Sequence, residues 1–266
     1  MKTYSSRMGL ALLWFFLCPI SSYSQQNPWS SSQNLFFCPT PFKLDNSWGE
    51  NNPAGYSNIN SIGFTAVNYF GIPELTEVGV TGNFHNKHLY LSSTIKRSNL
   101  IGLRYSEGSI SIGKDLTKSL KLGIQGGAWN KIGIESKQTT LPFFKIGLNH
   151  DNLGFQYGLV IGGQIISTHQ STKYKIPYSA GIKYTFYDSF GLGLIQGTDE
   201  MGNQGTFLNV SLNEKSNHGL KINIGLNNYN FSASYCFGGA RLNIVTTLYF
   251  INLMGTNQSA STTLIL

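Results

Sequence analysis

The chain has 266 residues and a formal net charge of +7, yet only 12% of its residues are charged, whereas a soluble domain averages about 25%. Beyond residue 20 there is no run of about 18 apolar residues, which argues against a membrane-spanning helix. A closed β-barrel is the other structure that satisfies every backbone group inside lipid. The 30 glycines and the 13% of aromatic residues fit that class.

Residues 1–24 have the pattern of an export signal. Lys2 and Arg7 form a basic start, residues 8–20 are apolar, and a serine-rich stretch for cleavage follows. An uncleaved membrane anchor is the alternative. An exported chain without a basic cluster is not expected to bind nucleic acid.

Residues 25–59 combine Ser, Asn and Pro with aromatic side chains and show no sustained period. They predict an irregular segment, either a flexible leader or a plug folded into the mouth of a barrel. Cys38 lies here and Cys236 lies in a late predicted strand. In an oxidising compartment the two could form a disulfide, and two free thiols are the alternative.

A turn motif ends this segment: Asn52, Pro53, Ala54 and Gly55. It resembles the segment before the first strand of the FadL-like outer-membrane transporters and of their Bacteroidota relatives PorV and PorQ, which are linked to type IX secretion. The resemblance implies a barrel of about fourteen strands, with the residues before the motif in or near the lumen. The chain is short for that group, which leaves little length for large outer loops.

Residues 153–165 show the strand pattern most clearly. Apolar side chains alternate with glycine and glutamine, and a period of two predicts a strand with unlike faces. An apolar face beside a face of small polar residues is typical of a strand between lipid and a tight lumen. The apolar side chains are Leu153, Phe155, Tyr157, Leu159 and Ile161.

We predict an all-β fold, an antiparallel transmembrane β-barrel over residues 60–250 with about fourteen strands, twelve being the alternative. The soluble alternative, a β-sandwich, would carry charges on its wet face, whereas here that face carries Gly, Ser, Asn, Gln and Thr. The predicted strands are 61–70, 77–84, 89–97, 100–106, 109–114, 119–128, 141–149, 153–165, 178–187, 190–197, 204–213, 218–226, 229–237 and 241–250.

Residues 251–266 are predicted to form a C-terminal tail after the terminal aromatic pair Tyr249 and Phe250. The polar part of this tail is expected to be loose. Its last three residues, 264–266, predict either a docking tail or a further short strand.

Six basic residues fall on the predicted polar face: Lys96, Arg104, Lys121, Lys145, Lys183 and Lys221. If the apolar face meets lipid, all six point into the lumen, which would favour an anionic solute or an acidic plug. The alternative is that they lie near strand ends and extend to water or to lipid phosphates.

No catalytic, metal or cofactor site is predicted. The histidines lie at strand ends or turns, and no serine lies in a G-x-S-x-G turn. The first functional interpretation is a non-catalytic binding or scaffold component of the bacterial outer membrane, with lipid and a protein partner, for example in type IX secretion. The alternative is a transporter for a small hydrophobic or anionic solute. A barrel hydrolase is the third and weakest interpretation, because no Ser-His-acid set can be assembled.

Overall fold

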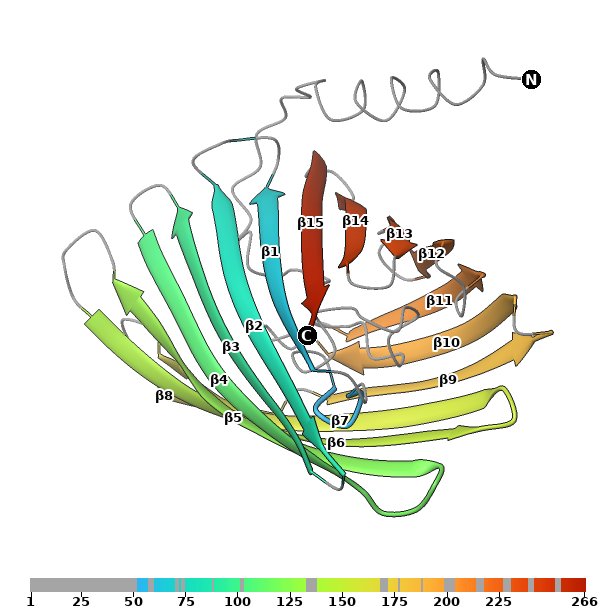
Figure 1. Cartoon of the computed structure of the whole chain (residues 1–266). Coiled ribbons are helices and arrows are strands. Elements are labelled where there is room, and N and C mark those ends of the chain that lie inside the picture. Colours follow the sequence, from blue (N-terminus) through green and yellow to red (C-terminus); the bar gives the residue numbers. More distant parts are fainter. Residues whose placement is uncertain are drawn as a thin grey trace.

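Within the residues that it describes, the computed structural model of the chain contains fifteen β-strands (Figure 1). Among the described residues, no helix is long and apolar enough to span a membrane. The structure describes residues 52–56, 60–69, 72, 75–87, 89–100, 103–132, 138–167, 172–176, 178–187, 189–198, 204–213, 218–226, 231–238, 242–251 and 255–266.

The strands follow the chain order and every pairing is antiparallel. Their bounds are β1 Ser61–Tyr69, β2 Thr76–Asn86, β3 Leu89–Leu100, β4 Leu103–Asp115, β5 Leu120–Ile132, β6 Gln138–Asn152, β7 Phe155–Ser167, β8 Thr172–Lys175, β9 Tyr178–Phe186, β10 Phe190–Thr198, β11 Gln204–Leu212, β12 His218–Gly225, β13 Phe231–Gly238, β14 Leu242–Ile251 and β15 Gly255–Ile265.

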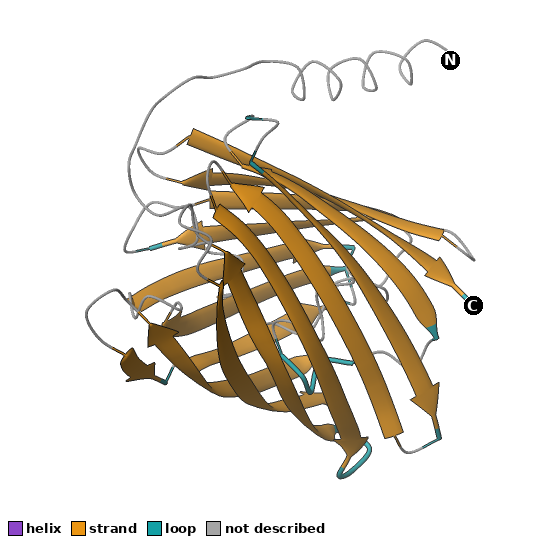
Figure 2. Ribbon diagram, turned by 90° about the vertical axis from the view of Figure 1, so that its left-hand side faces the viewer, coloured by secondary structure: helices purple, strands orange, loops and turns teal. Residues whose placement is uncertain are grey.

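The pairings form a closed ring, because β1 pairs with β15 and β6 pairs with β7 (Figures 1 and 2). Strands β8 and β9 both pair with β7 in one continuous register. The sequence has a proline at position 177, between them, and proline has no N–H to give to a ladder. The fifteen strands, with β8 and β9 in one line, therefore occupy fourteen positions around the barrel.

Side chains alternate between two unlike faces along the strands. In β10, Leu192 and Leu194 are exposed while Gly191 and Gly193 are buried. The exposed face is apolar around the ring, and the buried face carries mainly Gly, Ser, Thr and Asn, the pattern of a lipid-facing wall around a polar lumen. The predicted transmembrane β-barrel is confirmed. Examples from the outer face are Phe64, Val80, Ile95, Ile110, Ile124, Ile146, Leu159, Ile182 and Ile224.

The predicted count of about fourteen agrees with the fourteen positions, but three of the predicted boundaries are wrong. The predicted strands 100–106 and 109–114 are one strand, β4, which runs without a break through Glu107 and Gly108. Residues 255–266, expected in the tail, include β15, which closes the barrel between β14 and β1. Leu153 lies in a two-residue turn with Gly154, both at positive φ, so β7 begins only at Phe155.

Deleting residues 255–266 is expected to prevent barrel formation. The deletion leaves the edges of β1 and β14 without partners, and each unsatisfied backbone group in lipid costs several kcal/mol. The measurement is the electrophoretic mobility of the refolded chain before and after heating, which separates a folded barrel from unfolded chain. A chain that lacks only Leu266, which lies beyond β15, is the control and should fold. Folded mobility in the longer deletion would contradict the prediction.

Candidate functional site

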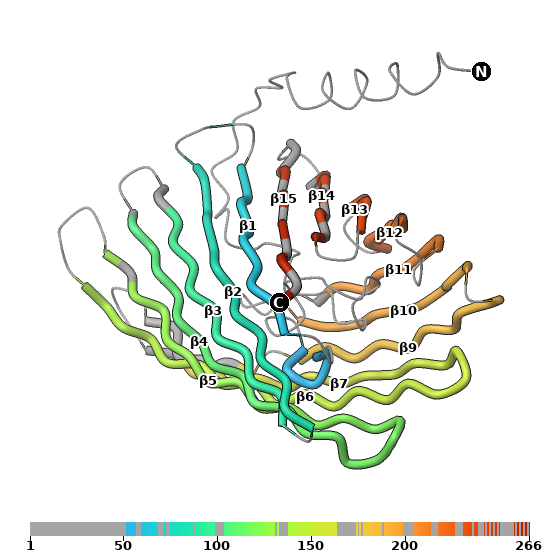
Figure 3. Tube along the Cα trace, in the orientation of Figure 1, coloured from blue at the N-terminus to red at the C-terminus, as the bar shows by residue number. Residues whose placement is uncertain are grey.

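Residues 52–56, here called the inner segment, lie inside the ring of strands (Figure 3). They lie near the end at which short turns join β2 to β3, β4 to β5 and β6 to β7, which we call the turn end. All five residues are buried. The side-chain Oδ1 of Asn52 accepts a hydrogen bond from the N–H of Ala54 at 2.9 Å. The backbone carbonyl of Asn52 accepts one from the N–H of Gly55 at 2.8 Å. This Asx-type turn fixes the segment locally.

A row of glycines on the lumenal wall, here called the glycine row, receives the inner segment: Gly113, Gly123 and Gly147. The three are direct cross-strand partners on β4, β5 and β6. A Cβ on Gly123 would overlap the carbonyl group of Pro53. One on Gly147 would overlap the Asn52 side chain, and one on Gly113 would overlap the Tyr56 ring. Only glycine lets the backbone approach this closely.

Tyr56 ties the inner segment to the wall through one carboxylate. Its hydroxyl donates to Asp115 Oδ1 at 3.1 Å, and the hydroxyl of Tyr90 donates to Oδ2 at 2.9 Å. The two rings stack with centroids 3.6 Å apart. Lys121 Nζ donates to the Tyr56 carbonyl at 3.2 Å and lies 4.7 Å from its ring centroid. Burial and then Asp115 raise the pKa of Tyr56, so its hydroxyl stays a donor.

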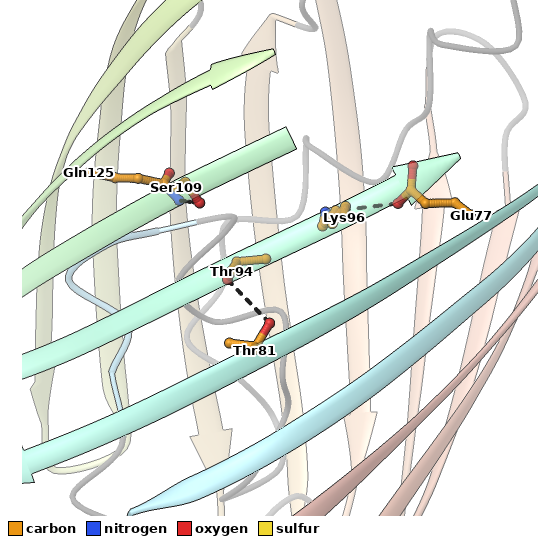
Figure 4. A network of polar contacts seen from close by, with 6 residues as sticks. All are labelled: Glu77, Thr81, Thr94, Lys96, Ser109 and Gln125. Atoms are coloured by element: carbon orange, nitrogen blue, oxygen red, sulfur yellow. Dashed lines mark hydrogen bonds and ion pairs between the residues drawn. The ribbon is translucent and has the colours of Figure 1, made fainter. Parts of the chain in front are cut away.

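The rest of the lumenal wall is largely polar and cross-linked between strands, with buried apolar exceptions at Val67, Val160, Ile195 and Phe207. The hydroxyl oxygens of Thr81 and Thr94 are hydrogen-bonded at 3.2 Å. The Nζ of Lys96 lies 4.0 Å from Glu77 Oε1. Asn209 donates to Asn223 at 2.6 Å. Figure 4 shows the Thr81–Thr94 and Lys96–Glu77 contacts together with the hydrogen bond from Gln125 to Ser109.

Many polar atoms on this wall are buried and have no hydrogen-bond partner in the described protein. Buried polar groups in folded proteins are almost always satisfied by protein or by ordered water. A wall with this many unsatisfied donors and acceptors therefore fits a lumen that contains water or a polar solute better than a dry core. The residues on the lumenal face are Asn83, Ser92, Ser98, Gln125, Trp129, Asn149, Gln156, Ser179 and Asn209.

Five of the six predicted basic residues lie on the lumenal face: Lys96, Lys121, Lys145, Lys183 and Lys221. Lys183 is 2% exposed and Lys221 7%, so the barrel wall covers them far more fully than a strand-end position would. Lys121 holds the inner segment, and Lys96 pairs with Glu77. A net positive lumen, and its preference for anions, stays a prediction.

Arg104 departs from the prediction, because it is exposed on the outer face with Ile110 and Ile112. The error follows from the boundary at residues 107–108. Because β4 is one strand, its two-residue period runs unbroken, so Tyr105 faces the lumen with Ser109 and Arg104 faces outward.

An apolar patch lies on the lumenal wall away from the inner segment. Four buried side chains, here called the aromatic cluster, form it: Tyr105, Trp129, Leu141 and Phe143. The rings of Trp129 and Phe143 stack with centroids 4.8 Å apart. Trp129 is 5% exposed, and its Nε1–H is among the donors without a partner. Lys145 Nζ lies 5.7 Å from the Phe143 ring centroid. The cluster can therefore offer a flat apolar surface, a hydrogen-bond donor and a nearby cation.

The cluster and the glycine row lie at opposite ends of the same strands. Trp129 is six residues beyond Gly123 on β5, which corresponds to about 20 Å along the strand. The cluster is therefore near the end where β5 and β6 are joined by residues 133–137, which we call the loop end. The lumenal wall thus has an apolar patch towards one end and a covered glycine row towards the other.

Some predicted features lie outside the described residues. These are the export signal, Cys38 and residues 25–51 and 57–59 of the predicted plug. Cys236 lies in β13 opposite Gly219, so its pairing with Cys38 stays a prediction. Among the described residues, no group of three His, Cys, Asp or Glu side chains could hold a metal ion.

Sequence reasoning located the turn motif at Asn52–Gly55 but not what it touches. The glycine row had a signal, since Gly113, Gly123 and Gly147 each occupy a polar-face position of a neighbouring strand. Nothing in the sequence alone distinguishes these three from the other strand glycines. The aromatic cluster had a weaker signal, because which face carries Trp129 depends on strand boundaries that the sequence leaves uncertain.

Solved structures that resemble this chain include a hydrocarbon channel and porins. CymD, a monoaromatic hydrocarbon channel, is 10% identical with a TM-score of 0.56, and the match covers 85% of this chain and 94% of CymD. KdgM porin in complex with oligogalacturonate is 8% identical with a TM-score of 0.46, covering 77% of this chain and 98% of KdgM. A mutant porin of Rh. blastica is 7% identical with a TM-score of 0.45, covering 78% and 99%.

No family model and no curated protein matches the sequence. The likeness to CymD shows the fold, which is that of outer-membrane β-barrel channels. At 10% identity it carries no information about the solute.

Gly123→Ala is expected to displace the inner segment, because its Cβ would overlap the carbonyl group of Pro53. Overpacking of this kind costs about 1–3 kcal/mol, which would raise amide exchange by about 5- to 160-fold. The measurement is hydrogen exchange at residues 52–56 in the refolded full chain, by mass spectrometry. Gly126→Ala is the matched control on the same strand, since a Cβ there has nothing within 4 Å. Equal exchange in the two variants would contradict the assigned contact.

Proposed function

We propose that the protein is an outer-membrane channel that holds a small, largely apolar solute at the aromatic cluster on its way through the lumen. The observation that carries this proposal is a stacked Trp129 and Phe143 on a wall that is largely polar. Apolar sites with a few placed polar groups are typical of small-molecule binding. The partnerless Nε1–H of Trp129 favours a solute that also has a hydrogen-bond acceptor.

The composition of the wall supports passage rather than a packed interior. The residues that face inward are mostly small, and many of their polar atoms lack a protein partner. Water in the lumen would satisfy these atoms. A scaffold barrel filled by its own side chains would instead show large residues in mutual contact around the ring.

The inner segment supports a channel that is closed at one end. It covers the glycine row and is held by the Tyr56 contact to Asp115 and the Lys121 contact to its backbone. In outer-membrane barrels the short turns face the periplasm. In this proposal a solute enters from the loop end, binds at the cluster and leaves only when the inner segment moves.

The wider assignment rests on the fold and on the turn motif. CymD, which has the same fold, is a monoaromatic hydrocarbon channel, and we extend a related role to this chain as part of the proposal. Membership of the FadL/PorV group rests on the four residues Asn52–Gly55 alone. Insertion in the outer membrane is supported by the apolar outer face of the ring.

Two other interpretations of the sequence stay predictions. A scaffold role in type IX secretion would need a partner surface outside the lumen. The second is a lumen in which the lysines favour anionic solutes. We also propose that the protein is not an enzyme.

Deleting residues 25–59 is expected to open the channel. The deletion removes the inner segment and uncovers the glycine row, while the ring of strand pairings stays complete. The measurement is single-channel conductance of the refolded chain in a planar bilayer, with and without these residues. Conductance steps that appear only after the deletion support the closed-channel proposal. Absence of conductance from both folded forms would contradict it.

Trp129→Phe is expected to weaken binding only of solutes that accept a hydrogen bond, because it keeps an aromatic ring and removes the N–H. The measurement is the block of the opened channel's current by acetophenone, which has a carbonyl acceptor, and by ethylbenzene, which has none. A hydrogen bond of about 1 kcal/mol predicts about a fivefold weaker block by acetophenone and no change for ethylbenzene. Equal effects on both solutes, or no block by either, would contradict the role of the cluster.

A further inference from the structure

Two arginines lie next to each other on the outer face near the loop end. Arg97 on β3 is paired with Ser106 on β4, and Arg104 is paired with Asn99, so the arginines are diagonal neighbours. Diagonal neighbours in an antiparallel pair have Cβ atoms about 7–8 Å apart, within reach of one another's long side chains. Both arginines are exposed.

Neither guanidinium group has an ion-pair partner in the described part of the chain. The acid closest to them on β4 is Glu107, whose position in the alternation places it on the lumenal face. The pair is therefore a site of uncompensated positive charge on a wall that otherwise meets lipid. Charged residues on the lipid side of a barrel are strongly unfavourable except near the interfaces.

The position of the pair along the barrel matches the headgroup level. From the arginine pair towards the turn end the outer face is apolar, with Ile95 66% and Ile110 56% exposed. Lys114, the next outward cation on β4, lies ten residues from Arg104. Ten residues span about 34 Å of strand, or about 26 Å along the axis at a tilt of about 40°. An outer-membrane barrel has an apolar band about 25 Å tall, so the two cationic positions bracket one such band.

We propose that Arg97 and Arg104 bind the phosphate of a lipid headgroup in the leaflet at the loop end. The planar guanidinium group donates two parallel hydrogen bonds to phosphate oxygens, and two of them can bracket one phosphate. Ser106, the cross-strand partner of Arg97, adds a hydroxyl on the same face. Such a site fixes the height of the barrel in the membrane and keeps one lipid at its wall. It does not depend on what passes through the lumen.

The test is native mass spectrometry of the refolded full chain in detergent with two probe lipids. Dioleoyl phosphatidic acid carries the phosphate, and dioleoylglycerol has the same chains without it. Arg97→Gln with Arg104→Gln is expected to lower phosphatidic acid binding about 25-fold, about fivefold for each cation at a membrane surface, and to leave dioleoylglycerol unchanged. The matched control is Lys87→Gln with Lys118→Gln, which removes the same charge from exposed turns at the turn end. It should bind like the parent chain.

Three results would overturn the proposal. The first is unchanged phosphatidic acid binding in the arginine variant, and the second is an equal loss in the lysine control. The third is inorganic phosphate bound as tightly as phosphatidic acid, which would indicate a soluble-anion site. Mobility before and after heating confirms that each variant is folded. If the glutamine variant does not refold, Arg97→Lys with Arg104→Lys keeps the charge and removes the planar fork. Severalfold weaker binding is then expected, and full binding would refute the arginine pair.

Discussion

The structure depends on the closure of one hydrogen-bonded ring. In lipid, no backbone N–H or C=O group can be left without a partner, so an open sheet edge is not tolerated. Strand β15 meets this constraint by pairing with β14 on one side and β1 on the other, and the β6–β7 hairpin joins the two arcs that result. Once the ring is closed, the two-residue period sends alternate side chains inward, and most of those inward positions hold small polar residues.

The closed ring places the glycine row against the inner segment. Three glycines in separate strands become one concave surface only because closure curves β4, β5 and β6 around the inner segment. The carboxylate of Asp115 then receives Tyr56 from the inner segment and Tyr90 from the wall. The result is an asymmetric lumen, with chain packed against the wall at the turn end and an aromatic surface near the loop end. That asymmetry is the feature on which the proposed channel with one entry and one controlled exit rests.

Much of the fold could be predicted, because each spanning strand records its surroundings in its own alternation. Residues 155–161 of β7 are the clearest case, with Tyr157 and Leu159 outside and Gly158 inside. The prediction was wrong where the alternation of apolar and polar residues is weak. Strand β15 is rich in Ser, Thr and Asn and has few apolar residues to mark its outer face. Arg104 was placed on the wrong face because β4 was divided in two, and every face assignment depends on an unbroken register.

The sequence by itself determined the class of protein, the alternating faces and the turn motif Asn52–Gly55, since each of these depends on residues close together in the chain. The tertiary structure decided what lies opposite what. Only the folded barrel brings Gly113, Gly123 and Gly147 beneath the inner segment. The register of the β5–β6 pair sets Trp129 against Phe143, and the register of the β3–β4 pair makes Arg97 and Arg104 neighbours on the outer face. Such contacts join residues far apart in the chain or depend on strand register, and a local pattern contains neither.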